Sequence, residues 1–119
     1  MISRRGVLGA ALAAPFAVFQ STRADAWPAK PIRMILPGPV GGVIDVGGRA
    51  VSETLQKDLG QPIIIDPRPG ANGILAAQLV LGSAADGYTL YLTVSGHVVL
   101  DLLMKAPFDV MGDFKPIAM

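Results

Sequence analysis

The chain has 119 residues, a formal net charge of +1, one histidine and no cysteine. Its ten lysines and arginines are scattered, which argues against a nucleic-acid-binding protein. Absence of cysteine excludes disulfides, thiolate metal sites and a cysteine nucleophile, and a single histidine leaves no convincing zinc site, so we expect neither a metal nor a cofactor.

The first 26 residues have the order of a secretory signal peptide. The pair Arg4-Arg5 precedes an apolar run from 7 to 19, and Ala24 and Ala26 supply the small side chains that a signal peptidase accepts. That run is shorter than the ~20 residues that span a bilayer, although an uncleaved anchor or a buried helix is the alternative. We therefore expect cleavage near Ala26, a periplasmic protein and no stable membrane insertion afterwards. Whether the signal is of the twin-arginine type stays open.

The remaining residues alternate apolar runs typical of buried strands with segments of helical periodicity. Strands are predicted at 32–36, 63–65, 88–94 and 117–119, and helices at 43–59, 74–81 and 98–104. Turns rich in proline and glycine separate them. This order predicts an α/β fold, a parallel sheet with flanking helices. The last strand begins without finishing, so we expect the sheet to be incomplete.

The loops that follow the strands are the candidate sites, because ligands of open α/β sheets bind beyond the carboxyl ends of the strands. The first loop, 37–42, precedes a predicted helix start, which would favour an anion near Pro39, Gly41 and Gly42. It has neither the dinucleotide-binding nor the P-loop pattern, and an ordinary tight turn is the alternative. Asp45 in the first helical turn would repel an anion unless its side chain points away.

The second and third loops contain further polar candidates. In the loop 66–73, Arg68 could hold a carboxylate by two parallel hydrogen bonds, or it could pair with a neighbouring acid and stiffen the loop. Asn72 lies at the end of the same loop. Ser95 and His97 follow the third predicted strand, where either could contact a ligand or have a structural role. Their spacing and surroundings do not match a Ser-His-Asp site, so we expect no enzyme.

Several stretches, in this order, together resemble one family. They are Trp27-Pro28-Ala29-Lys30-Pro31-Ile32-Arg33, Gly41-Gly42 with Asp45 and Arg49, Arg68-Pro69-Gly70-Ala71-Asn72-Gly73, Asp86-Gly87-Tyr88-Thr89-Leu90, Pro107-Phe108-Asp109 and Asp113-Phe114-Lys115-Pro116-Ile117. Each motif is weak alone, but the series covers essentially the whole chain after the signal peptide. The sequence resembles the Bug, or TctC-type, extracytoplasmic receptors of tripartite tricarboxylate transporters.

The resemblance implies a two-lobed Venus-flytrap fold that captures a small carboxylate between its lobes and delivers it to the membrane permease subunits. Because members are much longer, it also implies that 27–119 are an incomplete first lobe. Together with the loop analysis above, this leads us to predict Pro39, Gly41, Gly42, Asp45, Asn72, Ser95 and His97 as the substrate-binding residues. Gly38 and Ile44 depart from the family pattern, which usually has an aromatic and a small polar residue there.

Two other hypotheses remain open from the sequence. One is a small α/β enzyme that binds a phosphorylated or other anionic substrate at the glycine-rich loop, where Asp45 is the only available base. The other is a fragment without independent activity. A binding protein would be stabilised by carboxylates without turnover, whereas an enzyme would consume its substrate.

Overall fold

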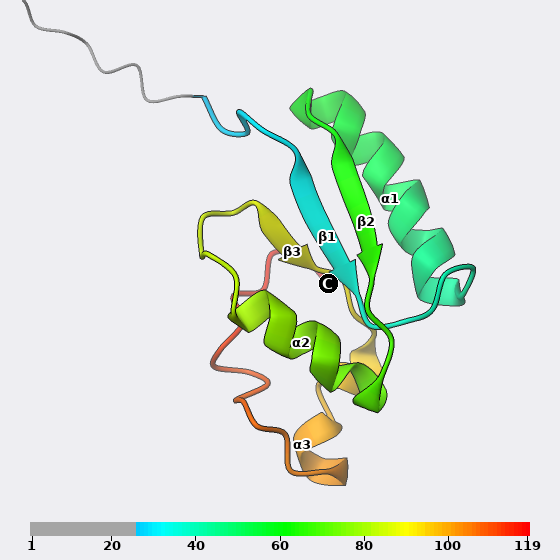
Figure 1. The fold of residues 1–119 in the computed structure, drawn as a ribbon, viewed down its shortest axis with the longest axis vertical. Coiled ribbons are helices and arrows are strands. Elements are labelled where there is room, and N and C mark those ends of the chain that lie inside the picture. The colour runs from blue at the N-terminus through cyan, green and yellow to red at the C-terminus, as the bar shows by residue number, and fades with distance from the viewer. Residues whose placement is uncertain (1–25) are drawn as a thin grey trace, which may run out of the picture.

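A computed structural model describes residues 26–119, the side chain of Asp101 excepted, so the predicted signal peptide lies outside the described part except for Ala26. The elements are β1 (Ile32–Leu36), α1 (Val43–Leu59), β2 (Ile63–Pro67), a 3-10 turn (Ala71–Gly73), α2 (Ile74–Leu81), β3 (Thr89–Tyr91), a second 3-10 turn (Ser95–His97) and α3 (Leu100–Leu103) (Figure 1). The strands form one parallel sheet in the order β2-β1-β3, which confirms the α/β prediction.

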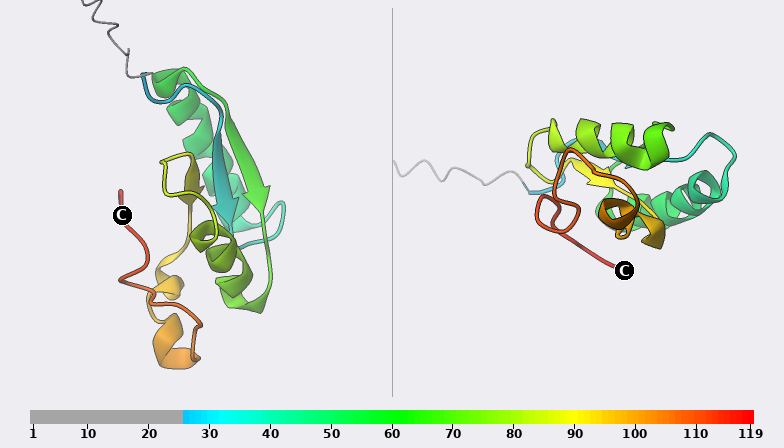
Figure 2. Two further views of the ribbon diagram at one scale, coloured as in Figure 1. Left: turned by 60° about the vertical axis from the view of Figure 1, so that its left-hand side comes forward. Right: turned by 90° about the horizontal axis from the view of Figure 1, so that it is seen from below.

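The helices α1 and α2 cover opposite faces of this sheet (Figure 2). The face under α1 holds a core cluster, which consists of Ile32, Met34 and Ile63 with the partly buried Leu55 and Leu59 of the helix. Because side chains alternate along a strand, Ile35 points to the other face, where α2 packs and buries Ala76 and Ala77. Within residues 26–119, no helix is long and apolar enough to cross a membrane.

The helix α1 has the predicted bounds and packs very closely on the sheet. Gly60 ends it with φ 68°, in the left-handed region that favours glycine, and donates its N–H to the Gln56 carbonyl. At Gly48 an added Cβ would lie 2.8 Å from Leu36 Cδ2 and 3.2 Å from Leu92 Cδ2. The missing side chain at Gly48 therefore sets the distance between α1 and the sheet, and with it the position of the loop joining β1 to α1.

Three predicted elements differ from the structure in the last third of the chain. β3 is shorter than the predicted strand 88–94. Leu92 still donates its N–H to Ile35 O, and the chain leaves the sheet after that bond. The helix predicted at 98–104 is only the short α3. The strand predicted at 117–119 is wrong. Among the described residues this segment finds no partner strand, and Ile117 is 81% exposed.

Candidate ligand-binding site

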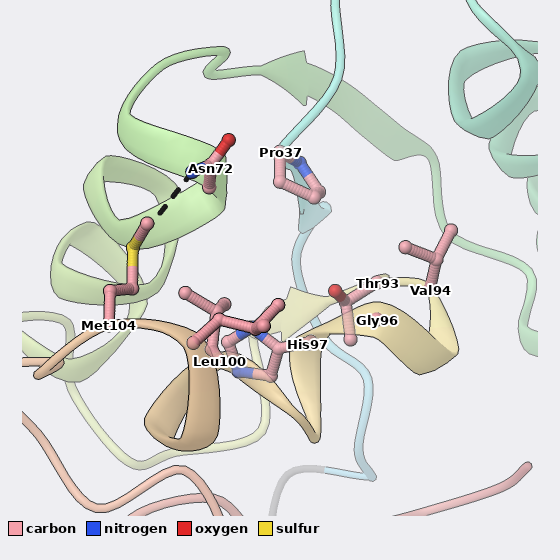
Figure 3. Close-up of a pocket in the computed structure, with 9 residues that line it drawn as sticks. Pro37, Asn72, Thr93, Val94, Gly96, His97, Leu100 and Met104 are labelled. Carbon is pink, nitrogen blue, oxygen red and sulfur yellow. Dashed lines mark hydrogen bonds between the residues drawn. The ribbon is translucent and has the colours of Figure 1, made fainter.

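The carboxyl ends of the three strands meet at one edge of the sheet, and two adjoining cavities lie there. The first cavity has a volume of about 350 Å³ and lies between the loop after β3, α3 and Asn72 (Figure 3). The second cavity, about 490 Å³, lies between the loops that follow β1 and β2. The two share Pro37, Asn72 and Val94, which come from the three different loops. The parallel strands therefore bring the three loops together at one edge of the sheet, where ligands of open α/β sheets bind.

The loop after β2 presents Asn72 to both cavities. Asn72 has φ 54° and the preceding Ala71 has φ 46°, so two consecutive non-glycine residues lie in the left-handed region. Such conformations are locally strained and persist where the surrounding structure holds them. The Asn72 amide donates a long contact of 3.9 Å to the sulfur of Met104 across the first cavity (Figure 3). Its exposed amide can therefore also reach a ligand.

His97, which lines the first cavity, belongs to an aromatic cluster that consists of Tyr91, His97, Phe108 and Phe114. His97 is only 7% exposed, stacks on Phe108 at a centroid distance of 6.1 Å and meets Tyr91 edge-on at 5.1 Å. Burial raises the pKa of the Tyr91 phenol, and a hydrogen bond with Thr93 partly opposes that rise. The cluster fixes the ring of His97 at the cavity wall.

Asp45 holds the loop between β1 and α1. Its side chain is 2% exposed and accepts hydrogen bonds from the Gly41 N–H at 2.9 Å and from Arg49 Nε at 3.1 Å. The Arg49 bond, and then the Gly41 bond, lower the pKa of Asp45 below its ordinary 3.8. Gly42 donates its N–H to Pro39 O at 3.1 Å. The N–H groups of both glycines are thus engaged within the loop.

Arg68 pairs with a neighbouring acid, as one of the two sequence hypotheses predicted. Its Nε lies 2.9 Å from Asp66 Oδ1, and Arg33 contacts the other carboxylate oxygen of Asp66. Burial alone would raise the pKa of Asp66, but the hydrogen bonds from Arg33 and Arg68 outweigh it and lower that pKa. Arg68 lines neither cavity, so its role here is to stiffen the loop.

A family model described as the tripartite tricarboxylate transporter family receptor matches residues 48–119, more than half of the chain. The chain belongs to this receptor family. Members are periplasmic solute-binding proteins and not enzymes, so the enzyme hypothesis is set aside.

Known proteins of the family agree with this assignment. A UPF0065 protein of Bordetella bronchiseptica is 48% identical over 100 residues, which are 82% of this chain and 30% of that protein. The periplasmic binding protein BugD is 28% identical with a TM-score of 0.73, over 76% of this chain and 31% of BugD. MatC of Rhodopseudomonas palustris, solved with bound malate, is 34% identical with a TM-score of 0.68, over 75% of this chain and 31% of MatC. The chain thus spans about 30% of the relatives' length and corresponds to part of a periplasmic-binding-protein fold.

The site residues predicted for this receptor chain fall into two groups. Those that line the cavities are Pro39, Asn72 and His97. Gly41, Gly42 and Asp45 lie outside both linings and shape the first loop. Ser95 is exposed and also lies outside both linings. Ligand contacts by all seven remain predictions.

Several residues that line the cavities were not among the predicted binding residues; they include Ile44, Thr93, Val94 and Met104. Thr93 and Val94 continue the alternation of β3, so the pattern assigned them to the strand. Ile44 shares the helical spacing of Val51, Leu55 and Leu59, so the pattern placed it on one face of the predicted helix. The short β3 is the structural signal that places Thr93 and Val94 at the site.

Proposed function

We propose that this chain is part of the first lobe of a periplasmic receptor, and that its two cavities receive one side of a small carboxylate. The proposal rests on one observation: the loops that follow β1, β2 and β3 all line the two adjoining cavities. The chain also belongs to a family of solute receptors. MatC, a structural neighbour, holds malate, which supports a carboxylate as the ligand class.

The proposal extends to the rest of the chain and to its partner. Residues 1–26 would be the signal peptide, removed near Ala26, and residues 27–119 the portion of the first lobe. The receptor would deliver its ligand to the membrane permease subunits of a tripartite tricarboxylate transporter. The family match supports this partner.

Neutral polar groups would hold the ligand's carboxylate. The Asn72 amide reaches the first cavity, and an amide N–H donates a hydrogen bond to a carboxylate oxygen. Thr93 lines the same cavity. The buried ring of His97 would form part of the wall of the first cavity, and Pro39 would form part of the second cavity. Asp45, with Gly41 and Gly42, would act by holding the loop.

Isothermal titration calorimetry of the purified chain with acetate, malate, adipate and citrate tests the proposal. Asn72→Gly removes the amide while keeping the left-handed backbone, so it should weaken carboxylate binding. Gln78→Ala removes an exposed amide on α2 outside both cavities and should leave binding unchanged. If a cooperatively folded chain gives no binding heat with any carboxylate, the proposal is refuted and a fragment without independent activity remains.

A further inference from the structure

The residues just before β1 lie folded against the turn that precedes β3. The N–H of Ala29 donates a hydrogen bond of 2.8 Å to the Tyr88 hydroxyl. The Trp27 ring lies 6.1 Å from the Tyr88 ring, centroid to centroid, and Lys30 Nζ lies 4.4 Å from the centre of the same ring. We refer to residues 27–30 together with residues 86–88 as the N-terminal clamp.

The turn side of the clamp is held in place by the sheet. Tyr88 packs against the core cluster under α1, and its carbonyl accepts the Arg33 N–H at 2.8 Å. Its own N–H is donated to Asp86 Oδ1 at 3.0 Å. Gly87 has φ 80°, in the left-handed region, and an added Cβ there would lie 3.3 Å from Trp27 Nε1. This glycine therefore both makes the turn and leaves room for the Trp27 ring.

The clamp engages the residues that directly follow the predicted end of the signal peptide. If the bond between Ala26 and Trp27 is cut, Trp27 to Lys30 are the first four residues on its carboxyl side. A peptide that a protease binds as an extended strand needs its main-chain groups for the partner. In the clamp the Ala29 N–H is already used, and the chain bends at Trp27, Ala29 and Lys30. None of the clamp contacts described above uses the amino group that cleavage creates, so the clamp can form while residues 1–26 are still attached.

Resting on the proposed removal of residues 1–26, we infer that the N-terminal clamp controls this cleavage: signal peptidase hydrolyses the Ala26–Trp27 bond only while the clamp is open. Hydrolysis adds one water molecule, leaving a carboxylate on Ala26 and an amino group on Trp27. Cleavage thus precedes docking of residues 27–30. The closed clamp afterwards holds the new terminus beside the amino ends of β1 and β3, whereas the cavities lie at the carboxyl ends.

The contacts of the clamp differ in how much each should matter. The ion pair between Lys30 and Asp86 spans 3.7 Å with both side chains largely exposed, so water and salt screen it and it contributes little. The hydrogen bond from Ala29 to Tyr88 fixes the main chain itself. Loss of one such bond raises the open population about two- to tenfold. Tyr88→Phe removes this bond and keeps the ring that Trp27 and Lys30 contact.

Purified signal peptidase in detergent micelles tests the inference on the full 119-residue chain and on a peptide of residues 1–36, which has the same bond but lacks residues 86–88. The chain should be cut about tenfold more slowly than the peptide, the combined effect of a hydrogen bond and an exposed cation–π contact.

Three variants of the full chain separate the contacts. Tyr88→Phe should speed cleavage about two- to tenfold. Asp86→Asn keeps an oxygen for the Tyr88 N–H but removes the counter-ion of Lys30, so it should change the rate less. Tyr91→Phe is the matched control: it removes a phenol hydroxyl that contacts the Gly73 carbonyl, away from the clamp, and should leave the rate unchanged.

Hydrogen exchange of the Ala29 amide, followed by NMR, measures clamp opening without the peptidase. Tyr88→Phe should speed this exchange by the same factor as cleavage. Circular dichroism checks that each variant folds, and the comparison of chain with peptide decides if one does not. Equal cleavage rates for the folded chain and the peptide overturn the inference and leave removal of residues 1–26 standing. Failure of the peptidase to cut either substrate after Ala26 overturns both, while carboxylate binding is judged by calorimetry alone.

Discussion

Two adjacent glycines in α1 provide a matched test of how this helix packs. Gly47 is exposed, and an added Cβ there would meet nothing within 4 Å. Gly48 is buried, and its Cβ would lie 2.8 Å from Cδ2 of Leu36, a residue that is 0% exposed. Replacing either glycine by alanine makes the same chemical change in the same helix, so any difference reports on the contact with the sheet.

The expected magnitudes follow from two effects. In a helix interior, alanine is favoured over glycine by about 0.8–1.0 kcal/mol, and both variants receive this gain. Crowding a well-packed core with an extra carbon costs about 1–3 kcal/mol, and this cost applies only to the Gly48→Ala variant. Gly47→Ala should therefore stabilise the chain by about 1 kcal/mol, while Gly48→Ala should lie between neutral and about 2 kcal/mol destabilised.

Thermal unfolding followed by circular dichroism measures the difference. For a domain of this size, 1 kcal/mol corresponds to roughly 4–8 °C in Tm, so the Gly47→Ala variant should melt above the parent chain and well above Gly48→Ala. Two variants that shift by the same amount in the same direction would refute the close packing of α1 on Leu36. The position of the loop joining β1 to α1, which depends on that packing, would then lose its support.

Three further predictions address single side chains. Because the pKa of Asp45 is lowered in the folded chain, its ion pair stabilises the fold above the ordinary pKa of 3.8, and this stabilisation is lost as pH falls through the lowered pKa. Denaturation should therefore show an Asp45→Asn deficit in unfolding free energy at about pH 7 that shrinks as pH falls below 3.8. Arg33→Gln should raise the pKa of Asp66 in an NMR titration, because burial then acts against fewer compensating hydrogen bonds. Ser95→Ala should leave carboxylate affinity in calorimetry unchanged, since Ser95 lines neither cavity, and a loss as large as that of Asn72→Gly would contradict this placement.

The parts of the fold that local patterns determine were predictable. Short β-branched or apolar runs between prolines gave β1 and β2, and the spacing of Val51, Leu55 and Leu59 gave α1, with Gly60 as its end. The parts that depend on partners were not. The apolar residues at 117–119 have a strand-like composition, but a strand requires a neighbour, and none of the described residues provides one.

The position of Ile44 shows why the site was harder to predict than the fold. α1 has 17 residues and the strand β1 that precedes it has five, which correspond to lengths of about 25 Å and about 17 Å. The helix therefore extends past the sheet, and an apolar residue in its first turn keeps the periodicity of the core-facing stripe while lying at the edge of the sheet. Periodicity reports only the direction in which a side chain points. Whether that direction meets the core or a cavity depends on where the sheet stops, so the spacing that correctly predicts α1 does not determine what Ile44 contacts.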